Sequence, residues 1–407
     1  MQNCLESDAE TILLTDWNCP EIVDREKQLE EIKNIINMLI SEKLPPLTYV
    51  YGASGSGKTF VIKRVFENEM NNIRKYLPMF KFYYINCREF GVPSIHLFWV
   101  SLAMQLKEYL PLFSKYLNQI IGNFPLRGWT TDDYKNVLKE LVKEKKLSIL
   151  VVLDEVDKLE GFEDLIYQLR GFNEDLEPYI GISAIFISNK IKLLSSLSKS
   201  SFDRIGIKIH FTSYGVEDLF KILKVHAEYA LKKGSYSDEA LLAIAKKVFE
   251  VSNSAREAKI TLYNLAKMSK DKLDLSLIEK AFSETKKDLL TEEILTRPLH
   301  HKITLLSVIE FHKRTAKVPD DRGLFRYTII PTKANIYKVY QELCSMLQES
   351  PKSYRAFFDI INELDRYGLV KTEIQSLGKA RGVTTLIKPV ETVELLEPIV
   401  KKAIGIV

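Results

Sequence analysis

The residues with the clearest chemistry lie in a glycine-rich run close to residue 55. The run reads Gly52-Ala53-Ser54-Gly55-Ser56-Gly57-Lys58-Thr59 and fits the spacing GxxxxGK[ST]. Glycines let backbone N–H groups approach a phosphate without a Cβ in the way, and a helix that begins behind them points its positive end at the anion. We expect Lys58 to reach the β- and γ-phosphates and the Thr59 hydroxyl to bind Mg²⁺. This run, with Phe60 behind it, is the candidate site for ATP or ADP.

A second run supplies acids to the same chemistry. In Leu150-Val151-Val152-Leu153-Asp154-Glu155 four apolar residues lead into two carboxylates. Asp154 is expected to join the metal ligands, and Glu155 to activate the attacking water as a general base. Acids are common at strand ends, so the pair gains its meaning from the phosphate loop. Asp157 is interpreted as a surface or helix-start residue.

Three more polar residues are candidates for catalysis beside Glu155. Asn189 follows an apolar run and is predicted to orient the attacking water, with an ordinary loop asparagine as the alternative. Arg204 is a candidate arginine finger for a neighbouring subunit or for another ATPase, with an exposed loop arginine as the alternative. Arg256 opens a helix in an all-helical region, from which a lid could carry it to the γ-phosphate.

These side chains need a scaffold that brings them to one edge, and the chain predicts a parallel α/β sheet. Apolar runs alternate with helical patterns over its first half, which is typical of such sheets. Buried parallel strands should read as unbroken apolar runs, as residues 148–153 do. The expected strands are residues 47–51, 80–86, 147–153, 182–188 and 206–211.

The rest of the chain predicts two further domains. From about residue 215 the pattern is all-helical, and a linker near residues 291–298 leads to three helical segments and then short strands with glycines. The expected division is an N-terminal arm, a nucleotide-binding core, a helical lid and a terminal domain, over residues 1–20, 21–213, 214–293 and 294–407. The N-terminal arm is expected to be loose.

The terminal domain contains a candidate DNA-recognition helix. Ser350 is its expected N-cap and Pro351 its first residue, and an apolar stripe follows at helical spacing: Phe357, Ile360, Ile361, Leu364. The N-terminal end of such a helix meets base edges and phosphates in helix-turn-helix docking. Here that end carries Lys352, Ser353, Tyr354 and Arg355. Arg355 is suited to pair with guanine and Lys352 to contact a phosphate.

The composition is that of a soluble globular protein, and the charge of the terminal domain fits either a polyanion partner or an ordinary solvated surface. The net charge is +4, but residues 297–407 hold 18 of the 58 Lys and Arg against 12 of the 54 Asp and Glu. A hairpin predicted over residues 371–386 adds Lys379 and Arg381 at its turn. No apolar run approaches the length of a membrane helix, the start does not resemble a signal peptide, and the four cysteines lack metal-knuckle spacing.

Taken together, the glycine-rich phosphate loop, the acid pair that follows an apolar strand, the strand-end asparagine and the lid arginine indicate an AAA+ ATPase. Residues 20–29 (PEIVDREKQL) resemble the box upstream of the phosphate loop in the archaeal origin-recognition and cell-division-control replication initiators, and Asn86-Cys87-Arg88 resembles the same family. Residues 353–370 look like that family's winged-helix recognition helix. The resemblance implies adenine contacts from Ile22, Val23 and Arg25, and a DNA contact from Arg127 in an insertion at residues 125–130.

The resemblance also implies a function. We expect an ATP-dependent initiator with weak ATPase activity used as a nucleotide switch, which binds duplex origin DNA in the cytoplasm at the nucleoid. Its implied partners are the replicative MCM-type helicase and other initiator paralogues. A signalling (STAND-type) or transposition ATPase, with a winged helix used for protein contacts, is the alternative. The sequence departs from the family at Asn253-Ser254-Ala255-Arg256, where Gly-Asp-Ala-Arg is usual, and in a looser wing at Gly378-Lys379-Ala380-Arg381-Gly382.

Overall fold

The computed structural model describes residues 4–15, 19, 21–87, 94–106, 128–315, 330–376 and 383–406. The chain forms two compact units, Met1–Phe282 and Ser283–Val407. Arg127, Lys379 and Arg381, together with Arg88 and most of the predicted insertion, lie outside the described residues. None of the described helices is long and apolar enough to cross a membrane.

A five-stranded parallel sheet organises the first unit, as the alternating pattern predicted. The strand order is β2-β3-β4-β1-β5. The strands are β1 (Thr48–Gly52), β2 (Phe80–Asn86), β3 (Ser148–Asp154), β4 (Gly181–Ser188) and β5 (Ile207–Phe211). The first connection, from β1 to β2, carries the chain to the far edge of the sheet, so β1 lies between β4 and β5. The carboxyl end of β1 is therefore a topological switch point, where α/β sheets bind their ligands.

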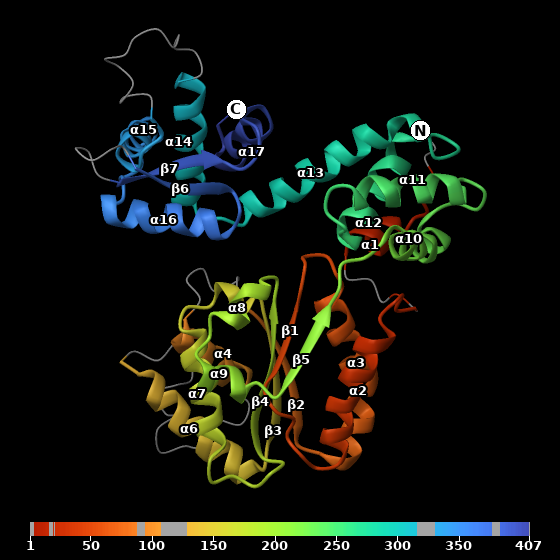
Figure 1. The fold of residues 1–407 in the computed structure, drawn as a ribbon, viewed down its shortest axis with the longest axis vertical. Helices are drawn as coiled ribbons and strands as arrows, with labels where there is room; N and C mark the ends of the chain where they lie inside the picture. Colours follow the sequence, from red (N-terminus) through yellow and green to blue (C-terminus); the bar gives the residue numbers. More distant parts are fainter. Residues whose placement is uncertain are drawn as a thin grey trace. The chain divides into compact units, whose positions relative to one another are not determined.

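Helices cover both faces of this sheet (Figure 1). Side chains alternate along β3: Ile149 and Val151 enter one apolar cluster, whereas Leu150 and Val152 enter the other. Strands that are apolar on both faces need cover on both. The first cluster is covered by α4 (Ile95–Gln105), α6 (Thr131–Lys145) and α7 (Phe162–Asn173), and the second by α2 (Glu26–Ile40) and α3 (Lys58–Tyr76). Two short helices, α8 (Ile191–Ser195) and α9 (Lys199–Arg204), follow β4 in the sequence and lead to β5.

A helical lid follows β5 in the same unit. It consists of α10 (Val216–Ala230), α11 (Asp238–Phe249), α12 (Ala255–Met268), the 3-10 turn η3 (Leu275–Leu277) and the start of α13 (Ile278–Leu295). The N-terminal segment differs from the expected loose arm, because α1 (Ala9–Leu14) packs against α10 and α12. Ala9, Ile12 and Leu13, at helical spacing, enter the apolar core of the lid.

Helices and a hairpin build the second unit around one apolar core. Its helices are α14 (Leu299–Thr315), α15 (Lys333–Met346), α16 (Tyr354–Arg366) and α17 (Val393–Ile404), and β6 (Val370–Ser376) pairs antiparallel with β7 (Val383–Pro389). This arrangement is a winged helix. The stripe Phe357, Ile360, Ile361 and Leu364 is buried, as predicted. The final helix α17 was not predicted; it packs on α14 through Leu396, Ile399 and Val400.

The recognition helix begins later than the sequence predicted. Ser353, and not Ser350, is the N-cap of α16, and its hydroxyl accepts a hydrogen bond from the Ala356 N–H at 3.3 Å. The reason lies in α15: the N–H of Lys352 donates to the Tyr340 hydroxyl at 3.0 Å, and the Lys352 carbonyl accepts from the Tyr337 hydroxyl at 2.8 Å. Both backbone groups of Lys352 are therefore used outside the helix.

Candidate functional site

The predicted phosphate loop connects β1 to α3, in the order that its motif requires. Gly55 and Gly57 have φ angles of 74° and 86°, the left-handed region that glycine adopts without strain. A Cβ on Gly55 would lie 2.8 Å from the Cβ of Ser254 in the lid. The loop therefore needs glycine at this position both for its backbone turn and for the close approach of the lid.

Lys58 lies at the start of α3 with its ammonium turned back to the loop. Its Nζ donates to the carbonyl oxygens of Gly52 (3.0 Å) and Ala53 (2.7 Å), and lies 3.4 Å from the Ser56 hydroxyl. The side chain is 5% exposed, and this burial lowers the pKa of Lys58 to about 8, against the opposing charges of Asp154, Asp157 and Glu155. A buried ammonium held by neutral carbonyls is suited to receive an anion.

The Thr59 hydroxyl and the Asp154 carboxylate meet, although 95 residues separate them. Thr59 Oγ1 donates to Asp154 Oδ2 at 2.5 Å, and Tyr84 Oη in β2 donates to the same oxygen at 2.8 Å. The backbone at Asp154 is anchored as well, because its carbonyl accepts from the Cys87 N–H at 3.0 Å. Tyr84 was not among the predicted site residues; only the pairing of β2 with β3 places it there.

This pair of oxygen donors fits Mg²⁺, which takes hydroxyl and carboxylate oxygens and leaves its other positions to water and phosphate. Within the described part of the chain, no group of three or more His, Cys, Asp or Glu could hold a metal ion. A metal at Thr59 and Asp154 would take the rest of its ligands from water and from phosphate oxygens, as is typical of nucleotide sites.

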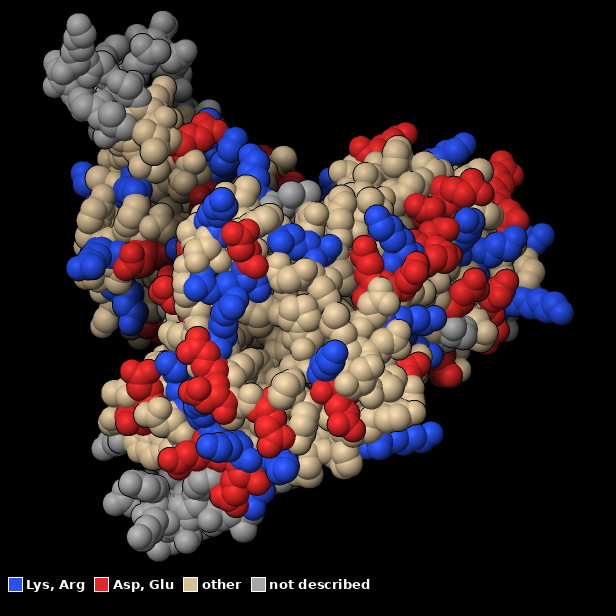
Figure 2. Space-filling model, turned by 60° about the horizontal axis from the view of Figure 1, so that its bottom comes forward, with Lys and Arg blue, Asp and Glu red and all other residues tan. Residues whose placement is uncertain are grey.

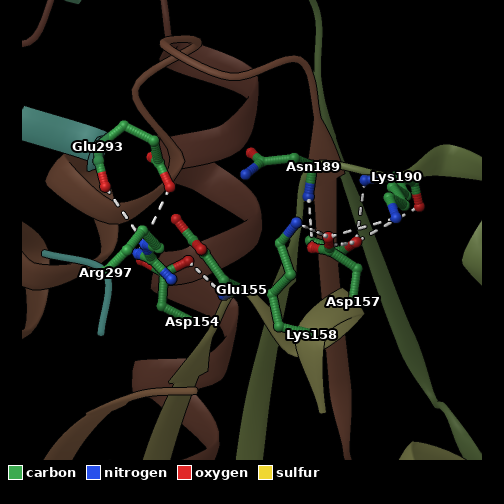
Figure 3. Close-up of polar contacts among 9 residues, drawn as sticks. Asp154, Glu155, Asp157, Lys158, Asn189, Lys190, Glu293 and Arg297 are labelled. Atoms are coloured by element: carbon green, nitrogen blue, oxygen red, sulfur yellow. Dashed lines mark hydrogen bonds and ion pairs between the residues drawn. The ribbon is translucent and has the colours of Figure 1, made fainter. Parts of the chain in front are cut away.

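Glu155 follows directly at the end of β3, with a left-handed backbone (φ 55°, ψ 42°). This conformation is uncommon for a residue with a side chain and costs of order 1 kcal/mol. It turns the chain sharply into the 3-10 turn η2 (Val156–Lys158). Figure 3 shows Asp154 and Glu155 side by side at this turn, with Asp157 after them and Asn189 on the neighbouring strand end.

Of the two interpretations of Asp157, surface residue or helix-start residue, the structure agrees with the second, because Asp157 lies in the first turn of η2. Its side chain is only 2% exposed, and Oδ1 lies 3.3 Å from the Ser188 hydroxyl and 3.4 Å from the backbone nitrogen of Asn189. Asn189 itself is exposed and, together with Ala53 of the phosphate loop, lines a pocket of about 520 Å³. The sheet thus brings Asn189 to the phosphate loop, as the candidate catalytic role requires.

Arg25 lies behind the phosphate loop. Its guanidinium donates to the carbonyl oxygens of Ser56 (3.2 and 3.0 Å) and Thr212 (3.0 Å), and stacks 3.8 Å above the ring of Tyr214. With 3% exposure it supports the loop from within the protein. Ile22 packs against the apolar cluster of the sheet and Val23 against that of the lid, so this segment contacts both. The adenine contacts predicted for these two residues stay predictions.

The lid helix α12 starts against the phosphate loop. The Ala255 N–H donates to the Gly55 carbonyl at 3.2 Å, and Arg256, the next residue, is exposed. Ser254 stands where the family usually has Asp, and its hydroxyl caps α12 by accepting from the Glu257 N–H at 3.3 Å. Ser and Asp cap helices in the same way, so this departure keeps the helix start in place.

Arg204 lies in α9 with partners of its own unit. Its Nη1 donates to the Ser200 carbonyl (3.0 Å) and hydroxyl, and its guanidinium lies 4.0 Å from the ring centre of Tyr167. The role of Arg204 as an arginine finger stays a prediction.

The start of α16 is accessible, because the four residues predicted to contact DNA there are all exposed: Lys352, Ser353, Tyr354 and Arg355.

Comparisons with known proteins agree with this architecture. Residues 22–204 match the model of the ATPase domain predominantly from Archaea, and residues 292–394 match the CDC6 C-terminal winged helix domain. The ORC1-type DNA replication protein 3 of Saccharolobus solfataricus is 30% identical over 372 residues, 89% of this chain and 84% of that protein. Its counterpart from Sulfurisphaera tokodaii is 28% identical over 377 residues, 90% and 86% of the two chains. Among solved structures, the Aeropyrum pernix ORC1 protein in complex with DNA has a TM-score of 0.73 at 22% identity, covering 99% and 98%.

Proposed function

The chain belongs to the ORC1-type DNA replication protein family, and from this premise we propose that it is an ATP-controlled replication initiator that binds duplex origin DNA. One observation carries the nucleotide part: Thr59 and Asp154, distant in sequence, meet at 2.5 Å and offer the hydroxyl and carboxylate oxygens that would hold Mg²⁺. The DNA part is supported by the accessible start of α16, and by the A. pernix ORC1 protein, which has this fold and was solved in complex with DNA.

In the proposed reaction the phosphates replace the loop carbonyls as partners of Lys58. When bound, Mg²⁺ neutralises charge on the phosphates. Glu155 takes the proton of the attacking water, and Asn189 orients that water from the adjacent strand end. Arg256 reaches the γ-phosphate from α12, whose first residue already contacts Gly55. With these side chains in place, we expect slow hydrolysis of ATP to ADP and phosphate.

The lid gives this chemistry a route to control. Because the Ala255 N–H bonds to the loop itself, a change at the γ-phosphate acts on α12 and the helices packed with it. We therefore propose that nucleotide serves as a switch more than as fuel. Recruitment of the replicative helicase and contacts with other initiator paralogues follow from the family relationship and belong to this proposal.

On DNA, α16 enters the major groove with its N-terminal end first. Arg355 pairs with guanine, Lys352 contacts phosphate, and Ser353 and Tyr354 lie at the same edge. Arg127, Lys379 and Arg381 are proposed as additional contacts on the family pattern. Basic and acidic side chains are interspersed over the face drawn in Figure 2. The DNA part of the proposal depends on the exposed start of the recognition helix.

Point variants test the two halves separately. Lys58→Ala is expected to lose nucleotide binding, and Glu155→Gln to bind ATP without hydrolysing it. Arg355→Ala is expected to weaken binding to the organism's own origin duplex by about 1–3 kcal/mol, as a guanine contact would. Each phosphate contact contributes about −0.9 to the slope of log affinity against log salt concentration. Lys352→Ala should therefore make this slope less negative by about 0.9. Unchanged duplex affinity in both DNA variants would favour a signalling or transposition ATPase instead.

A further inference from the structure

Asp157 is a buried carboxylate that the proposed reaction does not use. Its side chain is 2% exposed, and an ionised carboxylate in such a place needs charged or hydrogen-bonding partners. Oδ2 lies 3.9 Å from the ammonium of Lys158 and 4.0 Å from that of Lys190. Oδ1 faces the Ser188 hydroxyl and the Asn189 N–H. These four groups come from two places in the chain, η2 and the end of β4.

The contacts of Asp157 join the two turns that carry the water-binding residues. Asp157 lies in η2, two residues after Glu155 and its left-handed backbone. Its Oδ1 holds the backbone nitrogen of Asn189, the first residue after β4. Because β3 and β4 are neighbours, the two turns lie at the same edge of the sheet. Figure 3 shows Asp157 between Lys158 and the Asn189–Lys190 turn.

The turn at Asn189 has further hydrogen bonds, which lie around Lys190. The Ser188 hydroxyl accepts from the Lys190 N–H at 3.0 Å, and the Lys190 carbonyl accepts from the Tyr49 hydroxyl at 3.3 Å. Both of these bonds fix Lys190, one residue beyond Asn189. The Asp157 carboxylate contacts the Asn189 backbone nitrogen directly, at 3.4 Å. It therefore helps to hold the backbone position from which the Asn189 side chain extends.

We propose that Asp157 is a positioning residue for hydrolysis, which sets the place of Asn189 relative to Glu155. This inference rests on the proposed ATP hydrolysis. A displacement of about 1 Å in such a group can reduce a rate about 100-fold, whereas nucleotide affinity depends on the phosphate loop and is not affected. Asp157 is thus expected to act on turnover and to leave binding unchanged.

The test compares Asp157→Ala with Asn189→Ala and with the double variant in the full chain at about pH 7. Asp157 raises the pKa of Lys58, so its removal lowers that pKa, and the Kd measured beside the rate reports any resulting loss of charge on Lys58. We expect Asp157→Ala to lower single-turnover ATP hydrolysis by about 10- to 100-fold, with the Kd for a fluorescent ATP analogue within about threefold of the native value. If Asp157 acts through Asn189, the double variant hydrolyses ATP within about twofold of Asn189→Ala alone.

Two matched variants complete the design. Asp157→Asn keeps an acceptor oxygen for the Asn189 N–H, so it should fold if Asp157→Ala does not, and should recover most of the lost rate. Ser188→Ala removes the neighbouring hydroxyl, which contacts Asp157 Oδ1 and accepts from the Lys190 N–H, and it should reduce the rate less than Asp157→Ala does, because the Asn189 N–H keeps its acceptor. Independent, multiplying effects of Asp157→Ala and Asn189→Ala would overturn the proposal, as would equal losses in Kd and rate, or equal rates in Asp157→Asn and Asp157→Ala.

Failure of the underlying function gives a different pattern. If Glu155→Gln and Asn189→Ala hydrolyse ATP as fast as the native chain, the proposed catalytic site is wrong, and the role of Asp157 is overturned with it. If both are slow while Asp157→Ala is as fast as the native chain, only the inference about Asp157 is overturned.

Discussion

The hydroxyl of Tyr340 accepts a hydrogen bond from the backbone nitrogen of Lys352 at 3.0 Å. The same hydroxyl lies 2.8 Å from Nδ1 of His300 in α14, and Tyr340 is fully buried. A buried hydroxyl thus connects the first helix of the winged-helix unit to the residue that precedes the recognition helix. The edge that we propose to contact DNA is therefore held in place by the core of its own domain.

Replacing this hydroxyl should affect stability and DNA affinity together. Tyr340→Phe leaves the Lys352 N–H without its acceptor and removes the partner of His300, at a cost of about 1–3 kcal/mol. We expect an earlier unfolding transition and weaker duplex binding, measured by urea titration and fluorescence anisotropy. Tyr337→Phe is the control, since its bond to the Lys352 carbonyl is exposed and should contribute less. Equal effects of the two variants would contradict this assignment.

Nucleotide affinity should fall as the pH rises through about 8. Burial lowers the pKa of Lys58 from 10.5 to about 8, so above that pH the apo protein increasingly holds a neutral amine. At one unit above the pKa about a tenth remains charged, and ADP affinity should be about tenfold weaker than at pH 7. Titration with fluorescent ADP from about pH 6.5 to about 9.5 measures this. A constant affinity across this range would show that Lys58 does not bind the phosphates as an ammonium.

The same pKa has the opposite effect on the stability of the apo protein. Between about pH 8 and pH 10.5, the unfolded chain binds more protons at Lys58 than the folded chain does. The free energy of unfolding should therefore rise with pH over this range. Below about pH 8 the burial of the charge opposes folding in full. Lys58→Met lacks the titrating group and should lack this rise. Urea unfolding without nucleotide compares the native chain with the variant, and a parallel rise in both would exclude Lys58 as its source.

The approach of the lid to the phosphate loop should make Gly55 unusually sensitive. Gly55→Ala carries the cost of a left-handed backbone, about 1 kcal/mol, and in addition places a Cβ against Ser254. Gly234 has a similar φ of 82° but nothing within 4 Å of an added Cβ, which makes Gly234→Ala the matched control. We expect Gly55→Ala to lose ATP affinity while the control keeps it. Calorimetric titration with ATP distinguishes them, and equal affinities would contradict a close lid.

The N-terminal helix should contribute to the stability of the lid. Leu13 is 1% exposed in the lid core, whereas the next residue, Leu14, is 40% exposed. Leu13→Ala is expected to cost about 2–5 kcal/mol, and Leu14→Ala close to nothing. Hydrogen exchange of α10 and α12 in the full chain measures the difference. If exchange is the same in the two variants, the N-terminal segment is the loose arm that the sequence predicted.

Some of the candidate site was predictable because its residues are contiguous. The phosphate loop is a local backbone turn whose glycines and Lys58 follow one another, and the acids of β3 follow their own strand. Expected and observed bounds of that strand differ by one residue, 147–153 against Ser148–Asp154. An unbroken apolar run between turn residues has few alternatives in an α/β protein.

Other features depended on partners far away in the chain. The sequence predicts a surface or helix-start residue at Asp157, and only β4, which supplies Ser188 and Asn189 beside it, explains the burial of its side chain. Ser350 and Ser353 are equally good N-caps, and only the tyrosines of α15 decide between them. The six-residue helix α1 is too short to form by itself, and the lid core stabilises it.

The sequence by itself determined the fold class, the phosphate loop and the apolar stripe of α16, because each is encoded by neighbours within a few residues. Only the tertiary structure decided which oxygens meet at Asp154, where α16 begins, and why Asp157 is buried. Those outcomes depend on distances between segments that the chain joins over tens of residues, and side-chain types do not record such distances.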